Sequence, residues 1–170
     1  MKKLILFVSL LLPLLARADE PAAPSPDAAL DWFLGGTWIA TLPPRKDGTP
    51  VRIELNFTKP DNKNGVRFES SFFFGDKRAP YTCGMYAWNA VRQKYVIFYT
   101  DSSGSVTTGD VTLEGALWLH ELTASAKSGK AEPIQVRLTK VSADAFTNDI
   151  YIQKDGAWTP FISVRYERRQ

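Results

Sequence analysis

Cys83 and His120 are the only cysteine and the only histidine of this 170-residue chain, and together they could act as a nucleophile and its general base. They fall in predicted strands that are three apart along the chain, so a hydrogen bond between them would have to cross the interior of the fold. The simpler interpretation is that Cys83 packs as a small apolar residue and that His120 is a hydrogen-bonded or exposed strand residue. The sequence therefore favours a protein that is not an enzyme.

Metal and cofactor sites are the next candidates for chemistry. An ordinary metal site needs three or four converging His, Cys or carboxylate ligands, and the spacing of Asp and Glu brings no such group together. We therefore expect no metal and no cofactor. One alternative stays open, because a single imidazole can ligate five-coordinate haem and His120 could supply it. Asp101, Asp110 and Glu114 could form a carboxylate pair, but their positions near predicted loops are more typical of turn and surface residues.

Aromatic side chains are abundant, with ten Phe, six Tyr and five Trp. A barrel of eight or more strands either leaves room for one small ligand or is filled by its own side chains, and the sequence leaves both alternatives open. The residues that we expect to line the interior, and to bind a ligand there, are Phe57, Phe68, Phe72, Tyr86, Trp88, Tyr99, Trp118 and His120.

The N-terminal segment accounts for the net charge of +3. Lys2 and Lys3 precede an apolar run that ends in Ala16-Arg17-Ala18, the pattern of a secretory signal peptide over residues 1–18, cleaved after Ala18. Cleavage removes three of the 21 basic residues and none of the 18 acidic ones, so the remaining chain is neutral. We therefore expect a periplasmic or secreted bacterial protein with no nucleic-acid partner and no stable membrane anchor after cleavage.

Alternating apolar and polar residues predict an all-β fold. Residues 19–26 read as a flexible Pro/Ala linker, and Asp27 is placed to cap a short helix over 28–34 that Gly35-Gly36 ends. Short turns such as Asp155-Gly156 separate the later segments, which makes consecutive strands antiparallel neighbours. The predicted strands are one around Trp38 and those over 51–58, 66–74, 81–89, 94–100, 105–113, 116–125, 134–141, 146–153 and 158–168. A meander of eight to ten strands leaves two bare edges unless it closes into an up-and-down barrel, so we expect residues 27–170 to form one such domain.

Five motifs of the chain resemble those of a known superfamily: Gly36-Thr37-Trp38, "WFLGGTW", "YAWNAVRQKYVIFYTDSSG", "DGAW" and the terminal "RYER". Gly36-Thr37-Trp38 is similar to the Gly-x-Trp signature of the calycins, the superfamily that includes the lipocalins. The other four together resemble a group of bacterial exported lipocalin-like barrels of unknown function. The resemblance covers about residues 30–168. It implies a closed barrel in which Trp38 plugs one end beneath an Arg of the last strand, Arg168 or Arg165. The chain lacks the disulfide of secreted lipocalins, and His120 lies far from the C-terminal position of the His in haem-binding relatives.

The functional expectation is an exported lipocalin-like protein that binds a small, mostly apolar ligand in its lumen without catalysis. The alternatives are a solid barrel that acts through protein–protein association and, third, a haem protein using His120. Residues 95–99 and 117–122 are apolar on both faces, whereas half-buried antiparallel strands should alternate. Something is therefore expected to cover the outside of the sheet, either the helix over 28–34 or a second subunit in a homodimer.

Overall fold

The computed structural model describes residues 26–125 and 128–170. The predicted signal peptide and the predicted linker, apart from Pro26, lie outside these residues. Helix α1 (Pro26–Asp31) begins and ends earlier than the predicted helix over 28–34, so Asp27 lies within it rather than capping it. Pro is well suited to the first helical position because its missing N–H would have no partner there. The N–H groups of Phe33 and Leu34 bond three residues back, to Leu30 and Asp31, so the chain continues as a tight turn.

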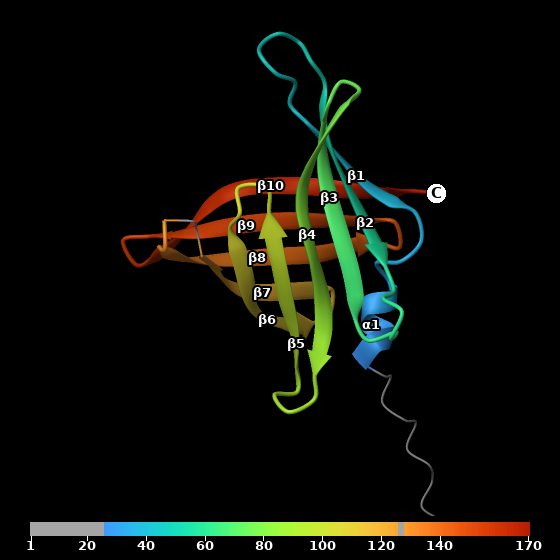
Figure 1. The fold of residues 1–170 in the computed structure, drawn as a ribbon, viewed down its shortest axis with the longest axis vertical. Coiled ribbons are helices and arrows are strands. Elements are labelled where there is room, and N and C mark those ends of the chain that lie inside the picture. Colours follow the sequence, from blue (N-terminus) through green and yellow to red (C-terminus); the bar gives the residue numbers. More distant parts are fainter. Residues whose placement is uncertain (1–25, 126–127) are drawn as a thin grey trace, which may run out of the picture.

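Ten antiparallel strands follow the helix and confirm the all-β prediction. They are β1 (Thr37–Leu42), β2 (Val51–Thr58), β3 (Val66–Phe74), β4 (Lys77–Asn89), β5 (Lys94–Asp101), β6 (Val106–Glu114), β7 (Leu117–Ser125), β8 (Ala131–Ser142), β9 (Ala145–Lys154) and β10 (Ala157–Arg169). Each strand pairs with the next, and β1 pairs with β10, where Trp38 lies opposite Arg168. The sheet therefore closes into a barrel without free edges. Strands β2, β3 and β4 cross β8, β9 and β10 at a steep angle (Figure 1).

The face of each strand that points inward is read from burial. On β7, Trp118, His120 and Leu122 are buried, whereas Leu117 and Leu119, which alternate with them, are half-buried on the outer side. In the sequence, the alternation of side chains did not show which of these two apolar faces of β7 points inward. The closed sheet decides, because only one face of β7 meets the inward residues of the opposite strands.

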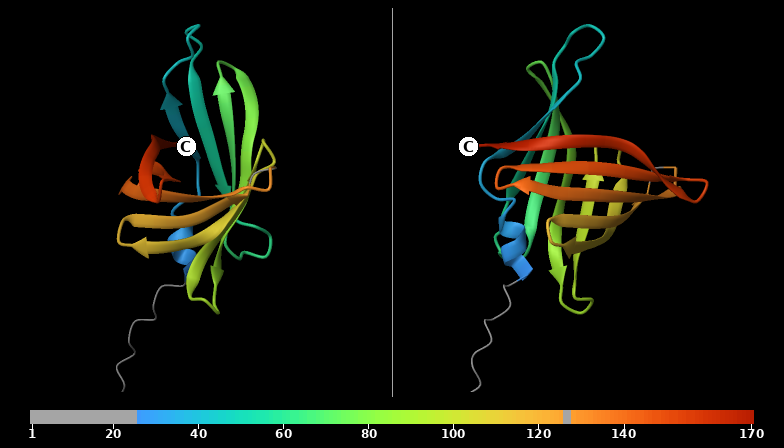
Figure 2. Two further views of the ribbon diagram at one scale, coloured as in Figure 1. Left: turned by 90° about the vertical axis from the view of Figure 1, so that its left-hand side faces the viewer. Right: turned by 180° about the vertical axis from the view of Figure 1, so that it is seen from behind.

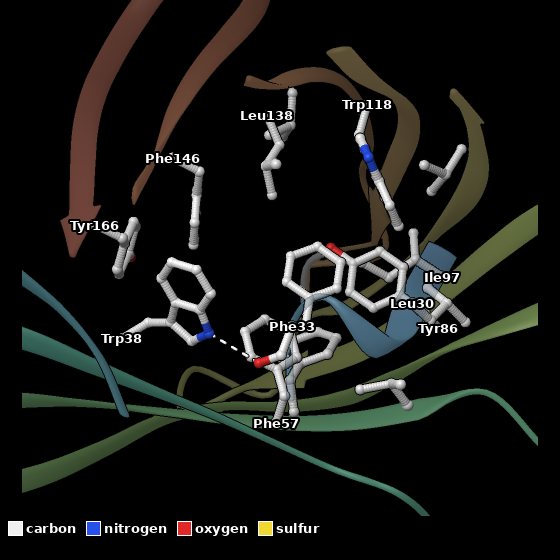
Figure 3. Close-up of a cluster of buried hydrophobic side chains, with 14 of the residues drawn as sticks. Leu30, Phe33, Trp38, Phe57, Tyr86, Ile97, Trp118, Leu138, Phe146 and Tyr166 are labelled. Carbon is white, nitrogen blue, oxygen red and sulfur yellow. Dashed lines mark hydrogen bonds between the residues drawn. The ribbon is translucent and has the colours of Figure 1, made fainter. Parts of the chain in front are cut away.

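Helix α1 and residues 32–34 fill one end of the barrel and together form a plug. Both views of Figure 2 place α1 at the end of the barrel opposite the hairpin loops that join β1 to β2 and β3 to β4. Leu30 and Phe33 are fully buried, and the Phe33 ring packs against Phe57 at 4.5 Å and Trp118 at 4.9 Å between ring centroids (Figure 3). Of the two covers that the sequence allowed for the outside of the sheet, the helical segment is therefore excluded. Its apolar side chains enter the barrel because the inward aromatic side chains of the surrounding strands pack against them.

Trp38 and Arg168 hold this plug in place. Trp38 is fully buried and its indole Nε1 donates to the carbonyl of Phe33 at 2.9 Å. The guanidinium of Arg168 lies 4.3 Å from the Trp38 ring and donates to the carbonyls of Leu34 at 2.9 Å and Trp32 at 2.6 Å. A cation over an indole face is attracted by the ring quadrupole. Arg165, the other candidate in the sequence, pairs with Glu167 on the exposed face instead.

In the described part of the chain, no helix is long and apolar enough to cross a membrane. The same residues bring together no group of three His, Cys, Asp or Glu side chains that could hold a metal ion.

Candidate functional site

A cavity of about 340 Å³ lies in the barrel on the side of the plug that faces the open end. This volume is at the lower end of the range for small-molecule sites. Its walls come from eight of the ten strands, since β1, β6 and the helix contribute no lining residue. The lining residues are Ile53, Leu55, Phe57, Phe68, Ser70, Phe72, Tyr81, Thr82, Tyr86, Ile97, Tyr99, His120, Leu122, Val136, Leu138, Phe146, Asn148, Ile150, Phe161, Ile162, Val164 and Tyr166.

Two β-bulges form the mouth of the cavity. Pairing between β3 and β4 skips Tyr81, and pairing between β9 and β10 skips Phe161; in each case the preceding residue is a proline, Pro80 or Pro160. Proline cannot donate a ladder hydrogen bond, so it is tolerated at a bulge, and a bulge redirects the side chain of its extra residue. Tyr81 and Phe161 remain 42% and 66% exposed while lining the cavity. The lumen therefore reaches the surface between these two aromatic side chains.

His120 and Tyr86 form a hydrogen-bonded pair in the inner part of the cavity. His120 Nδ1 lies 3.2 Å from the carbonyl oxygen of Val136, which can only accept, so Nδ1 carries the hydrogen. Nε2 then accepts from the hydroxyl of Tyr86 at 3.1 Å. Burial lowers the pKa of His120 from 6.5 to about 4, and burial raises the pKa of Tyr86. Both side chains are therefore neutral at physiological pH, and both ring nitrogens of His120 are engaged.

The remaining polar groups of the lining are also uncharged. Ser70 and Thr82 pair through their hydroxyls at 2.5 Å. Burial raises the pKa of Tyr166 and of Tyr99. No Asp, Glu, Lys or Arg is among the described residues that line the cavity. The site can therefore hold an apolar body and make a few neutral hydrogen bonds, and it offers no ion pair to a charged group.

Six of the eight side chains predicted from the sequence line this cavity, namely Phe57, Phe68, Phe72, Tyr86, Tyr99 and His120. Trp88 and Trp118 do not line it. Both lie near the plugged end of their strands, where Trp118 packs against Phe33 and Trp88 packs on Tyr95 at 5.0 Å. Alternation places these tryptophans on the inner face, but it carries no information about distance from the plug.

Several lining residues were missed by the sequence reasoning. Phe161 follows Pro160 inside the predicted strand over 158–168, and Tyr81 follows Pro80 at the start of the predicted strand over 81–89. A proline in or beside a strand is a signal of a bulge. Asn148 interrupts the apolar series Phe146, Ile150 on the inner face of β9. A polar residue at an apolar position of an alternating strand is the signal that could have found it.

The other chemical candidates are separated in the structure. Cys83 is exposed, on the outer face of β4, so it is not the core residue that we expected and it cannot reach the inward His120. The reason is the alternation on β4, where the inward Thr82 and Gly84 flank it. Asp101 accepts from the backbone N–H groups of Ser103 and Ser105 in the turn after β5. Asp110 pairs with Arg92 and Lys94, and Glu114 is exposed at a strand end, so neither forms a carboxylate pair with Asp101.

The fold and the lumen together define the class: a closed, ten-stranded antiparallel barrel with an apolar internal cavity. No protein-family model matches the chain, and no curated protein matches it. Among solved structures it is similar to Rv2717c from M. tuberculosis, with a TM-score of 0.56, 16% sequence identity, and coverage of 86% of this chain and 99% of that one. At this identity the likeness shows the fold alone.

A second structure, that of EF1p2_mFAP2b bound to DFHBI, has a TM-score of 0.36 and 16% identity. It covers 85% of this chain and 100% of that one. The overlap is too loose to support an argument about function.

Proposed function

We propose that this protein binds a small, neutral, mostly apolar molecule in the lumen of its barrel and does not transform it. The observation that carries the proposal is the cavity of about 340 Å³, lined without a charged side chain among the described residues and reaching solvent between Tyr81 and Phe161. A soluble domain gains stability by filling its interior, so an apolar cavity with an exposed aromatic mouth is typical of a ligand site.

The test is binding of a neutral apolar fluorophore that is small enough for this cavity, 1-naphthylamine, followed by its emission. We expect saturable binding that Leu122→Trp weakens by about tenfold or more, equivalent to about 1.4 kcal/mol of binding free energy, because the larger side chain occupies part of the lumen. Leu119→Trp is the matched control, since Leu119 lies on the outer face of the same strand. Ile150→Trp provides a second filling variant from another wall. Absent binding, or equal binding by the filled and control variants, would overturn the proposal.

We also propose that the protein is exported to the periplasm or secreted, as a lipocalin-like protein of the bacterial exported group that it resembles. The support is the Ala16-Arg17-Ala18 pattern and the neutral chain that follows it. The test is N-terminal sequencing of the protein recovered from a bacterial periplasmic extract. We expect it to begin at Asp19, and retention of Met1 in a cytoplasmic fraction would contradict the proposal.

A haem function through His120 is not part of this proposal, because both ring nitrogens are already hydrogen-bonded. Nε2 accepts a hydrogen bond from the hydroxyl of Tyr86, and Nδ1 donates one to the carbonyl of Val136. Haem ligation would require one of these bonds to break. Association through the outer face is likewise left aside. Phe98 is 48% exposed there, and a single exposed apolar side chain does not by itself mark an interaction surface.

A further inference from the structure

Tyr166 brings a hydroxyl group to the lumen that the described part of the chain does not use. The residue lies on the inner face of β10 and lines the cavity. Its hydroxyl has no hydrogen-bond partner among the described residues. The side-chain oxygen of Asn148 also lacks a partner, but it is fully enclosed by protein, so no ligand can reach it. The Tyr166 hydroxyl is not enclosed in this way and is therefore open to a molecule in the cavity.

Aromatic packing holds the Tyr166 side chain in one direction. Its ring lies opposite Phe146 in the pairing of β9 with β10, and the two rings stack at 4.8 Å between centroids with an interplanar angle of 16° (Figure 3). Phe146 is itself fixed, because it packs edge-on against Trp38 at 4.9 Å. A ligand that bonds the Tyr166 hydroxyl therefore binds a preorganised group and does not have to order the side chain.

This hydroxyl is a hydrogen-bond donor at physiological pH. Burial, with a smaller contribution from Tyr81, raises the pKa of Tyr166, so the phenol keeps its hydrogen. A phenolic O–H can donate to any oxygen that carries a free lone pair. What the lumen presents at this point is therefore an uncharged donor in an apolar wall.

The other lining hydroxyls are less available to a ligand. Four of them are already hydrogen-bonded within the protein, namely those of Tyr86, Tyr99, Ser70 and Thr82. Tyr81 is 42% exposed at the mouth, where water can solvate it, whereas Tyr166 is only 6% exposed. An apolar ligand that covered the Tyr166 hydroxyl would leave it without any partner, and a buried donor left in that state is costly. A ligand that supplies an acceptor there avoids this cost.

The lining also restricts the charge of the acceptor. No Lys or Arg among the described lining residues could pair with a carboxylate, and transfer of an unpaired charge into such surroundings is strongly unfavourable. A carbonyl oxygen is neutral and only accepts. A ligand hydroxyl, by contrast, would bring a hydrogen that needs an acceptor of its own. A ketone, aldehyde or ester therefore matches the single donor of Tyr166 best.

We propose that the lumen selects neutral carbonyl compounds, whose oxygen accepts a hydrogen bond from the hydroxyl of Tyr166 while the rest of the molecule fills the apolar cavity. This inference rests on the proposed function, because it names the class of molecule bound at the same site. The volume of about 340 Å³ corresponds to a ligand of roughly ten to twelve non-hydrogen atoms if each takes about the 30 Å³ of a water molecule in its liquid.

The test measures how three probes of one size displace 1-naphthylamine at neutral pH: 1-tetralone, 1-methylenetetralin and 3-phenylpropanoate. In 1-methylenetetralin a CH₂ group replaces the carbonyl oxygen of the ketone. We expect Tyr166→Phe to weaken tetralone about three- to tenfold, the worth of one net hydrogen bond, without weakening methylenetetralin. Comparing the two proteins for each probe cancels the different hydration of the probes in water. Phenylpropanoate, the charged probe, should bind most weakly.

Carbon NMR of tetralone labelled at its carbonyl carbon gives a second readout. A hydrogen bond to a carbonyl oxygen moves this resonance downfield, so the signal of the bound ketone should lie further upfield in Tyr166→Phe than in the wild type. Thermal unfolding of Tyr166→Phe near the wild-type temperature would show that the lost affinity is not lost folding.

Two matched variants locate the hydrogen bond. Tyr151→Phe removes a hydroxyl from the outer face of β9, where the Tyr151 ring packs under Arg137, and should change no affinity. Tyr81→Phe removes the hydroxyl at the mouth and should leave the affinity for tetralone within about twofold of the wild type.

Three results would overturn the inference while leaving lumen binding intact. They are an equal effect of Tyr166→Phe on ketone and hydrocarbon, a loss of ketone affinity in Tyr81→Phe in place of Tyr166→Phe, and tightest binding of phenylpropanoate. Failure of tetralone to displace a fluorophore that does bind would overturn it as well. Absence of binding by the fluorophore and by all three probes would overturn the proposed function itself.

Discussion

Phe33 is the side chain whose removal tests most directly how this barrel is closed. It comes from the turn after α1, is fully buried, and packs its ring against Phe57, Tyr86 and Trp118 at centroid distances of 4.5, 5.7 and 4.9 Å. Phe→Ala in a packed core costs about 3–5 kcal/mol, through lost transfer energy and the cavity left behind. Since these neighbours come from three strands that cannot collapse together inside a closed sheet, we expect Phe33→Ala to lie in the upper half of that range.

The assay is equilibrium urea denaturation, with thermal unfolding as the second measurement. At roughly 2–4 °C for each kcal/mol in a domain of this size, the midpoint should fall by roughly 10–15 °C. Phe161→Ala is the matched control, because Phe161 is 66% exposed at the mouth and should change stability by less than about 0.5 kcal/mol. A loss below about 1 kcal/mol for Phe33→Ala, or equal losses for the two variants, would refute the plug.

Two further predictions concern pH and the cation over Trp38. Burial lowers the pKa of His120 from 6.5 to about 4. As the pH falls through 6.5, the unfolded chain therefore binds a proton at this residue that the folded protein does not. The free energy of unfolding should fall by about 2–3 kcal/mol between pH 7.5 and 4.5 for this reason. Denaturation curves of wild type and His120→Gln at both pH values measure this difference, and identical pH slopes would contradict it. Arg168→Ala should cost about 2–3 kcal/mol in urea denaturation, because it removes the donor from two partly buried carbonyls and the cation from the Trp38 ring. Arg165→Ala should stay within about 0.5 kcal/mol, and equal effects would show that the Arg168 contacts contribute no more than a surface ion pair.

The strands were predictable because their signals are local. On β2, Val51, Ile53 and Phe57 alternate with polar residues, and the structure buries those three side chains. The residues at which strands begin and end were harder to predict from the sequence. Between the predicted strands over 66–74 and 81–89 the structure has a turn of only two residues, because β4 begins at Lys77 and its Pro80 is accommodated at the bulge.

The candidate site was predictable only in part. Inner faces follow from alternation once one residue of a strand is placed, which explains why Phe57, Phe68 and Tyr86 were found. The height of a residue along the barrel depends on register and on how far the plug extends, and both are set by contacts between distant segments. For that reason Trp88 and Trp118 were assigned to the lumen although they lie beside the plug.

By itself, the sequence determined that this chain forms an antiparallel β meander with an aromatic inner face, since side-chain alternation and turn residues act over a few neighbouring positions. Tertiary structure alone decided that α1 enters the barrel, that His120 faces Tyr86, and that a cavity remains beside Asn148. The physical reason is that burial and cavity volume depend on side chains brought together from strands far apart in the chain. Packing, which is non-local, therefore decides where the barrel is solid and where a ligand could bind.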